Sequence, residues 1–283
     1  MTVALLLREA ERRLAEAGIE TAALDAELLL RHVTGWDRAH VIGASADFVS
    51  DEVARRFARL VDERARRRPL QYVTRQQAFW RHVFEVTPDV LIPRPETELL
   101  VEAALACLED SAAPIVVDVG TGSGCIAVSL AAERRDARVV GIDLSAAALG
   151  VARRNAAAAG VADRIEWREG NLLAPVAGLR GTITLVASNP PYADPAEQAG
   201  LPPEVRDHEP MLAVVAPEDR YSVYRRLAPA ACDALAPGGW LLLEVGLGMA
   251  DEVTRLCEDA GFAVDRVIPD LQSIPRTVVA RKR

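Results

Sequence analysis

Apolar residues recur at helical spacing over about the first 70 positions. The pattern predicts one helix that ends near Gly18 and a second that begins after a capping Thr21. A third helix begins after Ser50 and is stopped by Pro69, and its arginine run at 64–68 is expected to face water. We therefore predict a small helical bundle with little chemistry of its own, typical of an adaptor or recognition module.

Residues 71–95 follow a different pattern. Short segments with β-branched and aromatic side chains, including 71–73 and 83–86, predict a hairpin that links two parts of the chain. The segment 91–98 follows, and its Pro95 suits the first turn of a helix. The sequence leaves open whether this segment is a structural linker or the rim of a site.

From residue 114 onward, strand-like apolar runs alternate with helical patterns. Strands are expected at 115–117, 138–142, 165–167, 183–187 and 240–245 and around Val267 and Val278, with helices at 126–132, 145–159, 218–235 and 249–260. This alternation predicts an α/β fold with a mostly parallel sheet and helices on both faces. Because ligands of such folds bind beyond the carboxyl ends of the strands, the residues that follow each strand are the candidates for chemistry.

Composition narrows the class of protein. A chain of 283 residues suggests about two domains, and 50% hydrophobic with 26% charged residues is typical of a soluble globular protein. No apolar run approaches the roughly 18 residues of a membrane span and no secretory signal is evident, so we expect a cytoplasmic location. The cysteines and histidines show no metal-ligand spacing, so no metal site is expected.

The first strand of the alternating region leads into a glycine-rich loop with the spacing D-x-G-x-G-x-G, which begins at Asp118. Its glycines permit a tight turn and the close approach of a ligand to backbone N–H groups at a helix start. The dinucleotide fingerprint G-x-G-x-x-G would need glycine in place of Cys125, so the loop instead resembles the first motif of methyltransferases that bind S-adenosylmethionine. The candidate cofactor-binding residues of the loop are Gly120, Thr121, Gly122, Ser123 and Gly124.

Two further positions after strands suit a nucleoside cofactor. Asp143 ends the second strand, about 20 residues beyond the loop, where a carboxylate can accept hydrogen bonds from both hydroxyls of a ribose. The alternative is that Asp143 only caps the helix that begins near Ser145. Asn171, with Leu172 beside it, follows the third strand and is a candidate contact for the adenine edge.

The fourth strand ends in Asn189, Pro190, Pro191 and Tyr192, the most informative tetrad in the chain. Two adjacent prolines stiffen the backbone and remove two donors, so that the carbonyl groups remain as acceptors. Asn189 adds a side-chain acceptor and Tyr192 an aromatic wall. This corner suits a planar NH2 donor, either an amide or the exocyclic amine of a base, although a plain proline turn after a strand is the simpler alternative.

Taken with the segment 91–98, Glu209, Pro210 and the closing residues 270–276, these motifs resemble the HemK/PrmC family of methyltransferases over nearly the whole chain. The resemblance implies a Rossmann-like class I methyltransferase with a mostly parallel seven-stranded sheet and a small N-terminal helical bundle. It also implies three parts: a helical substrate-recognition domain at 1–75, a hairpin linker at 76–95 and an S-adenosylmethionine-dependent methyltransferase domain at 96–283.

The resemblance further implies methyl transfer from S-adenosyl-L-methionine to the glutamine amide nitrogen in the GGQ motif of class I peptide chain release factors. Asn189, Pro190 and Tyr192 would then be catalytic, and together with Pro191 they would bind the substrate, while Asn189 would also contact the cofactor. The partner would be the release factor, with the enzyme a monomer that binds neither DNA nor a membrane. Two departures stand out: the family usually has an acid in place of Asn171, and residues 214–217 replace a glycine-containing stretch.

Three other functions remain open from the residues alone. The same chemistry could act on a glutamine of a ribosomal protein or on adenine N6 in DNA, since the tetrad is shared with adenine methyltransferases. A DNA enzyme needs a basic groove, whereas this chain has a net charge of −8 and its excess acid lies beyond residue 85. A non-catalytic binding module is disfavoured because loop, acid and tetrad are all intact.

Overall fold

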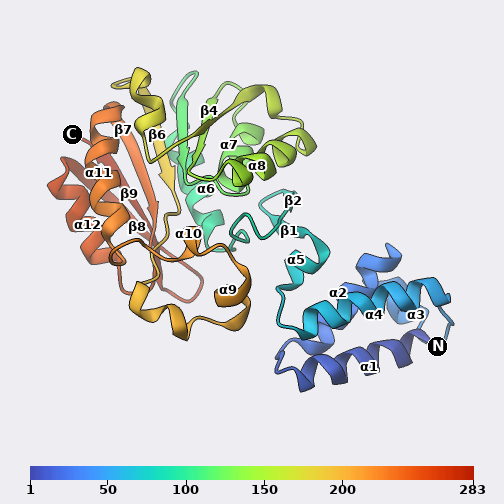
Figure 1. Ribbon diagram of the computed structural model, residues 1–283. Helices are drawn as coiled ribbons and strands as arrows, with labels where there is room; N and C mark the ends of the chain where they lie inside the picture. Colours follow the sequence, from blue (N-terminus) through green and yellow to red (C-terminus); the bar gives the residue numbers. More distant parts are fainter. The chain divides into compact units, whose positions relative to one another are not determined.

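The computed structural model describes residues 1–283, which form two compact units. The helical unit comprises Met1–Gln76 together with Pro202–His208, and the sheet unit comprises Gln77–Leu201 together with Glu209–Arg283. Figure 1 labels their elements. A short segment from late in the chain thus packs with the first unit, a grouping that no local pattern in the sequence indicates.

The helical unit contains six helices, of which the first five along the chain contribute to one apolar core. Leu14, Leu29, Leu30, Phe57 and Val61 are almost fully buried in it. The helices are α1 (Val3–Glu16), α2 (Ala22–Thr34), α3 (Arg38–Gly43), α4 (Asp51–Ala65), α5 (Leu70–Thr74) and α9 (Pro203–His208).

Of the two helix caps predicted in this unit, one is confirmed and one is not. The Ser50 hydroxyl accepts a hydrogen bond from the Val53 N–H at 3.3 Å and so caps α4 as predicted. Thr21 precedes α2 but its side chain accepts no capping bond, and its hydroxyl donates to the Asp25 carboxylate at 2.9 Å. The predicted capping role of Thr21 is therefore wrong.

The strand-like reading of 71–73 is also wrong, because these residues lie in helix α5. Tyr72 and Val73 are both buried, and two adjacent buried side chains do not fit the alternation of a half-buried strand. The hairpin begins later, as β1 (Gln76–Phe79) paired with β2 (His82–Glu85).

Arg64 contradicts the prediction that the arginine run faces water. Its side chain is only 8% exposed, and its Nε lies 2.7 Å from an Asp25 carboxylate oxygen. Its Nη1 lies 3.1 Å from Glu204, which also pairs with Arg67 at 2.8 Å. Since Phe57, Val61 and Arg64 are spaced by four and three residues, Arg64 lies on the buried stripe of α4.

The sheet unit has seven strands in the order β5-β4-β3-β6-β7-β9-β8. The first five of these are parallel to one another, and β9 runs antiparallel to both β7 and β8. This confirms the expected mostly parallel sheet. The strands are β3 (Ile115–Val119), β4 (Arg138–Asp143), β5 (Ile165–Glu169), β6 (Ile183–Ser188), β7 (Leu235–Glu244), β8 (Phe262–Pro269) and β9 (Pro275–Lys282).

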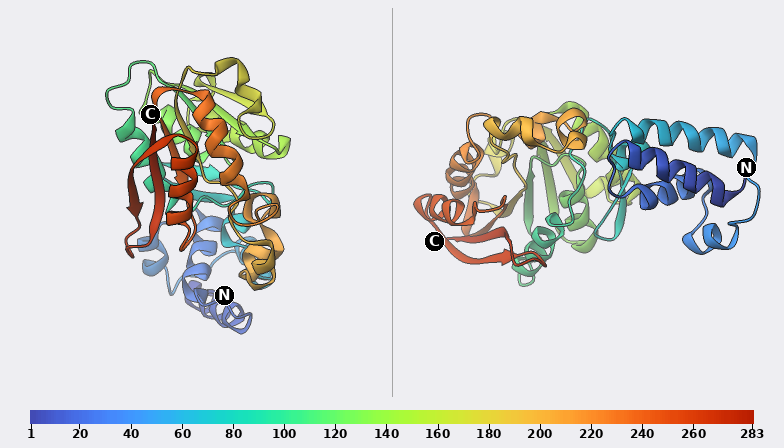
Figure 2. Two further views of the ribbon diagram at one scale, coloured as in Figure 1. Left: turned by 90° about the vertical axis from the view of Figure 1, so that its left-hand side faces the viewer. Right: turned by 90° about the horizontal axis from the view of Figure 1, so that it is seen from below.

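Helices cover both faces of the sheet, as Figures 1 and 2 show. One face packs against α6 (Thr97–Cys107), α7 (Cys125–Glu133) and α8 (Ala146–Ala158), and the other against α11 (Ser222–Ala234) and α12 (Ala250–Asp259). The shorter elements are α10 (Met211–Val214) and the 3₁₀ turns Ala162–Arg164, Ala174–Leu179 and Pro195–Gly200. None of the helices is both long and apolar enough to cross a bilayer.

The strand order reverses direction between β3 and β6. From β3 the chain continues outward through β4 and β5, and it then returns to place β6 on the other side of β3. Such a switch point leaves a crevice at the carboxyl ends of the two central strands. The loop after β3 and the tetrad after β6 are therefore neighbours.

Candidate active site

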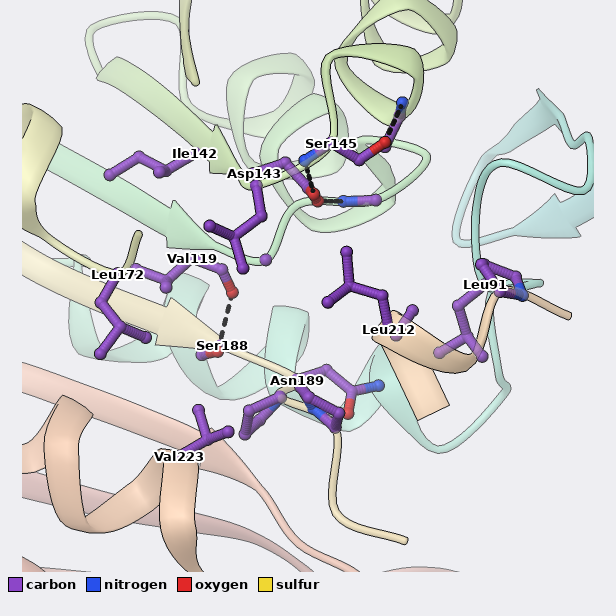
Figure 3. A pocket seen from close by; sticks show the side chains of 18 of the residues that line it. Leu91, Val119, Ile142, Asp143, Ser145, Leu172, Ser188, Asn189, Leu212 and Val223 are labelled. Carbon is purple, nitrogen blue, oxygen red and sulfur yellow. Dashed lines mark hydrogen bonds between the residues drawn. The ribbon is translucent and has the colours of Figure 1, made fainter. Parts of the chain in front are cut away.

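A cavity of about 380 Å³ lies at this crevice, within the range typical of small-molecule sites. Figure 3 shows Asp143 and Asn189 bordering it from different strands, with Leu91, Leu172 and Leu212 among its apolar walls. Of the predicted site residues, Gly120, Gly122, Asp143, Asn171, Leu172, Asn189, Pro190 and Pro191 line this cavity. Thr121, Ser123, Gly124 and Tyr192 do not line it.

The glycine loop contributes backbone to the cavity wall. Gly120, Gly122 and Gly124 have φ values of 72°, 56° and 81°, a region that favours glycine. The N–H groups of Gly120 and Thr121 donate to the Ile142 carbonyl, and that of Gly124 donates to the Thr121 carbonyl. These three N–H groups already have partners within the protein, and at Gly120 and Gly122 the loop gives the cavity a wall free of side chains.

Asp143 holds this wall in place. One carboxylate oxygen accepts the Gly122 N–H at 2.8 Å, and the other accepts the Ser145 N–H at 2.9 Å. Each oxygen keeps a second lone pair that can accept from a ligand hydroxyl. Burial raises the pKa of Asp143, and the two backbone N–H groups oppose that rise. The cap of α8 is Ser145, whose hydroxyl accepts the Ala148 N–H at 3.1 Å, so the alternative in which Asp143 only caps this helix is wrong and its ribose-binding role stays a prediction.

The residues after β5 form another part of the cavity wall. Asn171 is exposed at the rim, and Leu172 has a φ of 49°, which is unusual for a residue with a side chain. This backbone conformation accompanies a Leu172 side chain at the cavity wall, near Val119 in Figure 3. An amide at the rim beside apolar walls suits a flat heterocycle with polar edges.

The tetrad divides at Tyr192. Asn189, Pro190 and Pro191 line the cavity, whereas the Tyr192 ring packs against Gly246, where an added Cβ would lie 2.9 Å from the ring. Burial raises the pKa of Tyr192 to about 12, so it is a neutral phenol at physiological pH. Its packing against a substrate amide remains a prediction.

Asn189 is linked to a buried carboxyl group through one hydroxyl. Its Nδ2 donates to Thr97 Oγ1 at 3.2 Å, and Thr97 Oγ1 donates to Glu244 Oε2 at 2.6 Å. Glu244 is 2% exposed and forms no salt bridge, and burial raises its pKa to about 7. The buried Glu244 carboxyl group thus lies two hydrogen bonds from the Asn189 side chain.

Asp118, at the start of the glycine loop, is a second buried acid without a cation. Its Oδ2 accepts from Thr121 Oγ1 at 2.5 Å and from the Ala127 N–H at 3.2 Å, while its Oδ1 has no partner. Burial raises the pKa of Asp118 to about 7, and the nearby charge of Asp143 adds to the rise. Thr121 therefore serves the loop from behind the cavity wall.

The residues after Glu209 form part of the cavity wall that the sequence left undefined. Pro210, Leu212, Ala213, Val215 and Pro217 line it. Glu209, whose side chain is 1% exposed, pairs with Arg94 at 2.6 Å and accepts the Ile92 N–H at 3.4 Å. Since Leu91 also lines the cavity, the segment 91–98 contributes to the rim of the site.

Sequence reasoning missed Thr97 and Glu244. Thr97 was included only within the segment 91–98, and nothing in its local pattern indicates a partner. Glu244 did carry a signal, because it is one acid between Leu243 and Val245 at the carboxyl end of a central strand. A lone acid in an apolar strand is rarely buried without a reason.

Two family models match separate parts of the chain. The model described as the PrmC N-terminal domain matches residues 6–74, and the model described as the methyltransferase small domain matches residues 96–201. Each match falls on a part of the chain that the sequence assigned to the corresponding domain.

Curated relatives match over the full length. A protein of Cereibacter sphaeroides named release factor glutamine methyltransferase is 46% identical over 281 residues, covering 99% of each chain. One of Moorella thermoacetica with the same name is 40% identical and covers 100% of this chain and 99% of its own. A solved methyltransferase structure from Pyrococcus furiosus has a TM-score of 0.50 at 16% identity over 70% of this chain and 88% of that chain, a likeness of fold alone.

Proposed function

Because the chain belongs to the family of release factor glutamine methyltransferases, we propose that it methylates the side-chain amide nitrogen of glutamine in the GGQ motif of class I peptide chain release factors. The methyl donor is S-adenosyl-L-methionine. The observation that carries the proposal is one cavity that joins the glycine loop and Asp143 to the acceptor corner of Asn189 and Pro190.

The residues of the cavity fit the methyl donor. Asp143 would accept from the ribose hydroxyls, Asn171 and Leu172 would contact the adenine, and the bare glycine loop would allow close approach along the backbone. Thr121, Ser123 and Gly124 would support that loop from behind. When bound, the donor supplies a methyl group on a positively charged sulfur, which leaves as a neutral thioether.

The acceptor corner addresses the weak nucleophilicity of an amide nitrogen, whose lone pair is delocalised into its carbonyl. Asn189 Oδ1 and the Pro190 carbonyl would accept the two amide protons and hold the nitrogen in line with the methyl group, about 3–3.5 Å away. Both acceptors also stabilise the positive charge that develops on the nitrogen as the N–C bond forms. The proton is released to an acceptor or to water after transfer.

The helical unit completes the proposal as the part that recognises the release factor. The proposed division is a recognition domain at 1–75, a linker at 76–95 and a catalytic domain at 96–283. In this proposal the enzyme acts as a monomer in the cytoplasm. It does not act on DNA, in keeping with the net charge of −8.

Mass spectrometry of a purified release factor, incubated with the enzyme and isotopically labelled donor, tests this function. We expect one added methyl group on the glutamine of the GGQ motif. A release factor with that glutamine replaced by asparagine is the matched control and should remain unlabelled there. Labelling only of a ribosomal protein or of adenine in DNA would overturn the proposal.

A further inference from the structure

The hydrogen bonds from Asn189 to Glu244 have a defined direction. Thr97 has one hydroxyl proton, and the 2.6 Å bond gives it to Glu244 Oε2. The Thr97 oxygen can then only accept from Asn189. Asn189 must therefore turn its NH2 group toward Thr97, as the 3.2 Å bond records, and this leaves Oδ1 free on the other side of the amide.

The direction matters because the oxygen of an asparagine side chain accepts hydrogen bonds whereas its NH2 group donates them. An Oδ1 that faces the cavity accepts a proton from a substrate amide, whereas an NH2 group in that place would meet another donor. Nothing within Asn189 itself sets the choice, since rotation by 180° exchanges the two with little change of shape.

We propose that Glu244, acting through Thr97, is the positioning residue that makes Asn189 present its oxygen to the substrate amide. The proposal rests on the function proposed above. Glu244 and Thr97 touch neither substrate nor donor, and they act on the reaction only by orienting Asn189.

The charge of Glu244 decides the direction. As a carboxylate it can only accept, which forces the order Asn189 to Thr97 to Glu244. As a neutral acid it can donate to Thr97, whose proton then turns toward Asn189 and favours the reversed amide. Since burial raises the pKa of Glu244 to about 7, this change falls at physiological pH.

The other charged or titratable groups around Glu244 do not take over its role toward Thr97. Arg94 and Arg276 lower its pKa and Glu96 raises it, but none of the three forms a salt bridge with it. Tyr224 donates to the Glu244 main-chain carbonyl at 2.8 Å, so it leaves the carboxylate untouched. The Tyr192 phenol and the Cys125 thiol are both neutral at pH 7, because burial raises the pKa of each to about 12.

The test is kcat for glutamine methylation, at saturating donor and release factor, from pH 5.5 to 9. For the wild type we expect kcat to rise as the pH passes about 7 and then to level off. Glu244→Gln should lower the plateau roughly tenfold, as expected when one hydrogen bond no longer favours the productive orientation, and should flatten the profile. Thr97→Val should lower kcat by a similar factor, and Thr97→Ser should restore it.

Glu102→Gln is the matched control, because Glu102 lies on α6, the helix that begins at Thr97, but its side chain is exposed and outside the site. It should keep the wild-type profile. Thermal unfolding and affinity for the methyl donor, measured for every variant, distinguish a misoriented Asn189 amide from a misfolded protein. A merely structural role for Glu244 would change unfolding and leave the pH profile in place.

The outcomes separate the two proposals. A wild-type enzyme that methylates no glutamine overturns both. A wild-type enzyme that methylates normally, with Glu244→Gln or Thr97→Val equal to it in kcat and in pH profile, overturns the orientation proposal alone.

Discussion

The buried ion pair of the helical unit and two buried acids behind the cavity of the sheet unit differ in their partners. In the helical unit, Arg64 contacts Asp25 and Glu204, so each buried charge faces an opposite one. In the sheet unit, Asp118 and Glu244 are buried beside the cavity without a salt bridge, and hydroxyl groups are their side-chain partners. Burial raises the pKa of both acids to about 7.

This difference distinguishes charges that stabilise the fold from charges that lie near the candidate active site. A buried ion pair keeps its charges and closes a contact between distant segments, here α2, α4 and α9. Burial without a neighbouring cation destabilises the ionised form of an acid and so raises its pKa. Groups with shifted pKa values cluster at functional sites. The position of Asp118 and Glu244 behind the cavity wall fits that rule.

Removing the cation of the helical unit should have the largest effect. Arg64→Ala leaves Asp25 buried without its partner, so we expect the free energy of unfolding to fall by about 3–5 kcal/mol. Denaturant unfolding measures the loss. The neighbouring Arg66 is exposed, and Arg66→Ala should change stability little. Equal stability of Arg64→Ala and Arg66→Ala would show that the pair contributes nothing.

Asn189→Ala should produce the next largest effect, this time in the sheet unit and on rate alone. Loss of one preorganised polar contact should lower kcat by about 10²–10³-fold, while donor affinity stays near that of the wild type. Single-turnover kinetics and isothermal titration measure the two quantities. Lost donor binding with normal turnover would reverse the division of roles between the tetrad and Asp143.

Asp143→Ala should act on the donor rather than on the rate. Loss of charge-assisted hydrogen bonds to the ribose, and of the bonds that hold Gly122 and Ser145, should weaken donor binding roughly 10- to 100-fold. Asp143→Asn keeps one acceptor oxygen and should lose less. Titration of both variants measures the change, and an unchanged affinity in Asp143→Ala would argue against the ribose role.

The smallest expected effect is on how stability changes with pH, and its sign should differ between Glu244 in the sheet unit and Glu204 in the helical unit. One group can change the free energy of unfolding by at most about 1.4 kcal/mol per pH unit. The pKa of Glu244 is raised from 4.5, so its contribution to stability is present below 4.5 and is lost as pH rises through about 7. Burial opposes ionisation of Glu204, but Arg67 and Arg64 outweigh it and lower its pKa. Its contribution is therefore present above 4.5 and is lost on acidification.

Urea unfolding of Glu244→Gln and Glu204→Gln from pH 4 to 8 measures both slopes. The stability advantage of the wild type over Glu244→Gln should shrink as pH rises, and its advantage over Glu204→Gln should shrink as pH falls. Slopes of the same sign in both comparisons would contradict the difference between the units.

Local patterns predicted most of the sheet unit. Strands such as β3 and β6 are mostly apolar and buried along nearly their whole length, as expected for strands covered on both faces. The parallel order then places the residues after those strands together, which is why Gly120 and Asn189 could be assigned to one site. Helix α5 was missed because a segment of five residues carries too little periodicity to separate helix from strand.

The sequence by itself determined the alternation of strands and helices, the positions of the glycine loop and the acceptor corner, and the family resemblance, because each depends on neighbouring residues or on a motif. Only the tertiary structure decided which charges are buried and what they contact. Arg64 meets Glu204, and Asn189 meets Thr97 and Glu244, across long stretches of chain. Burial and hydrogen bonding between distant segments arise from packing, and packing sets both the ionisation of these acids and the direction of the bonds they accept.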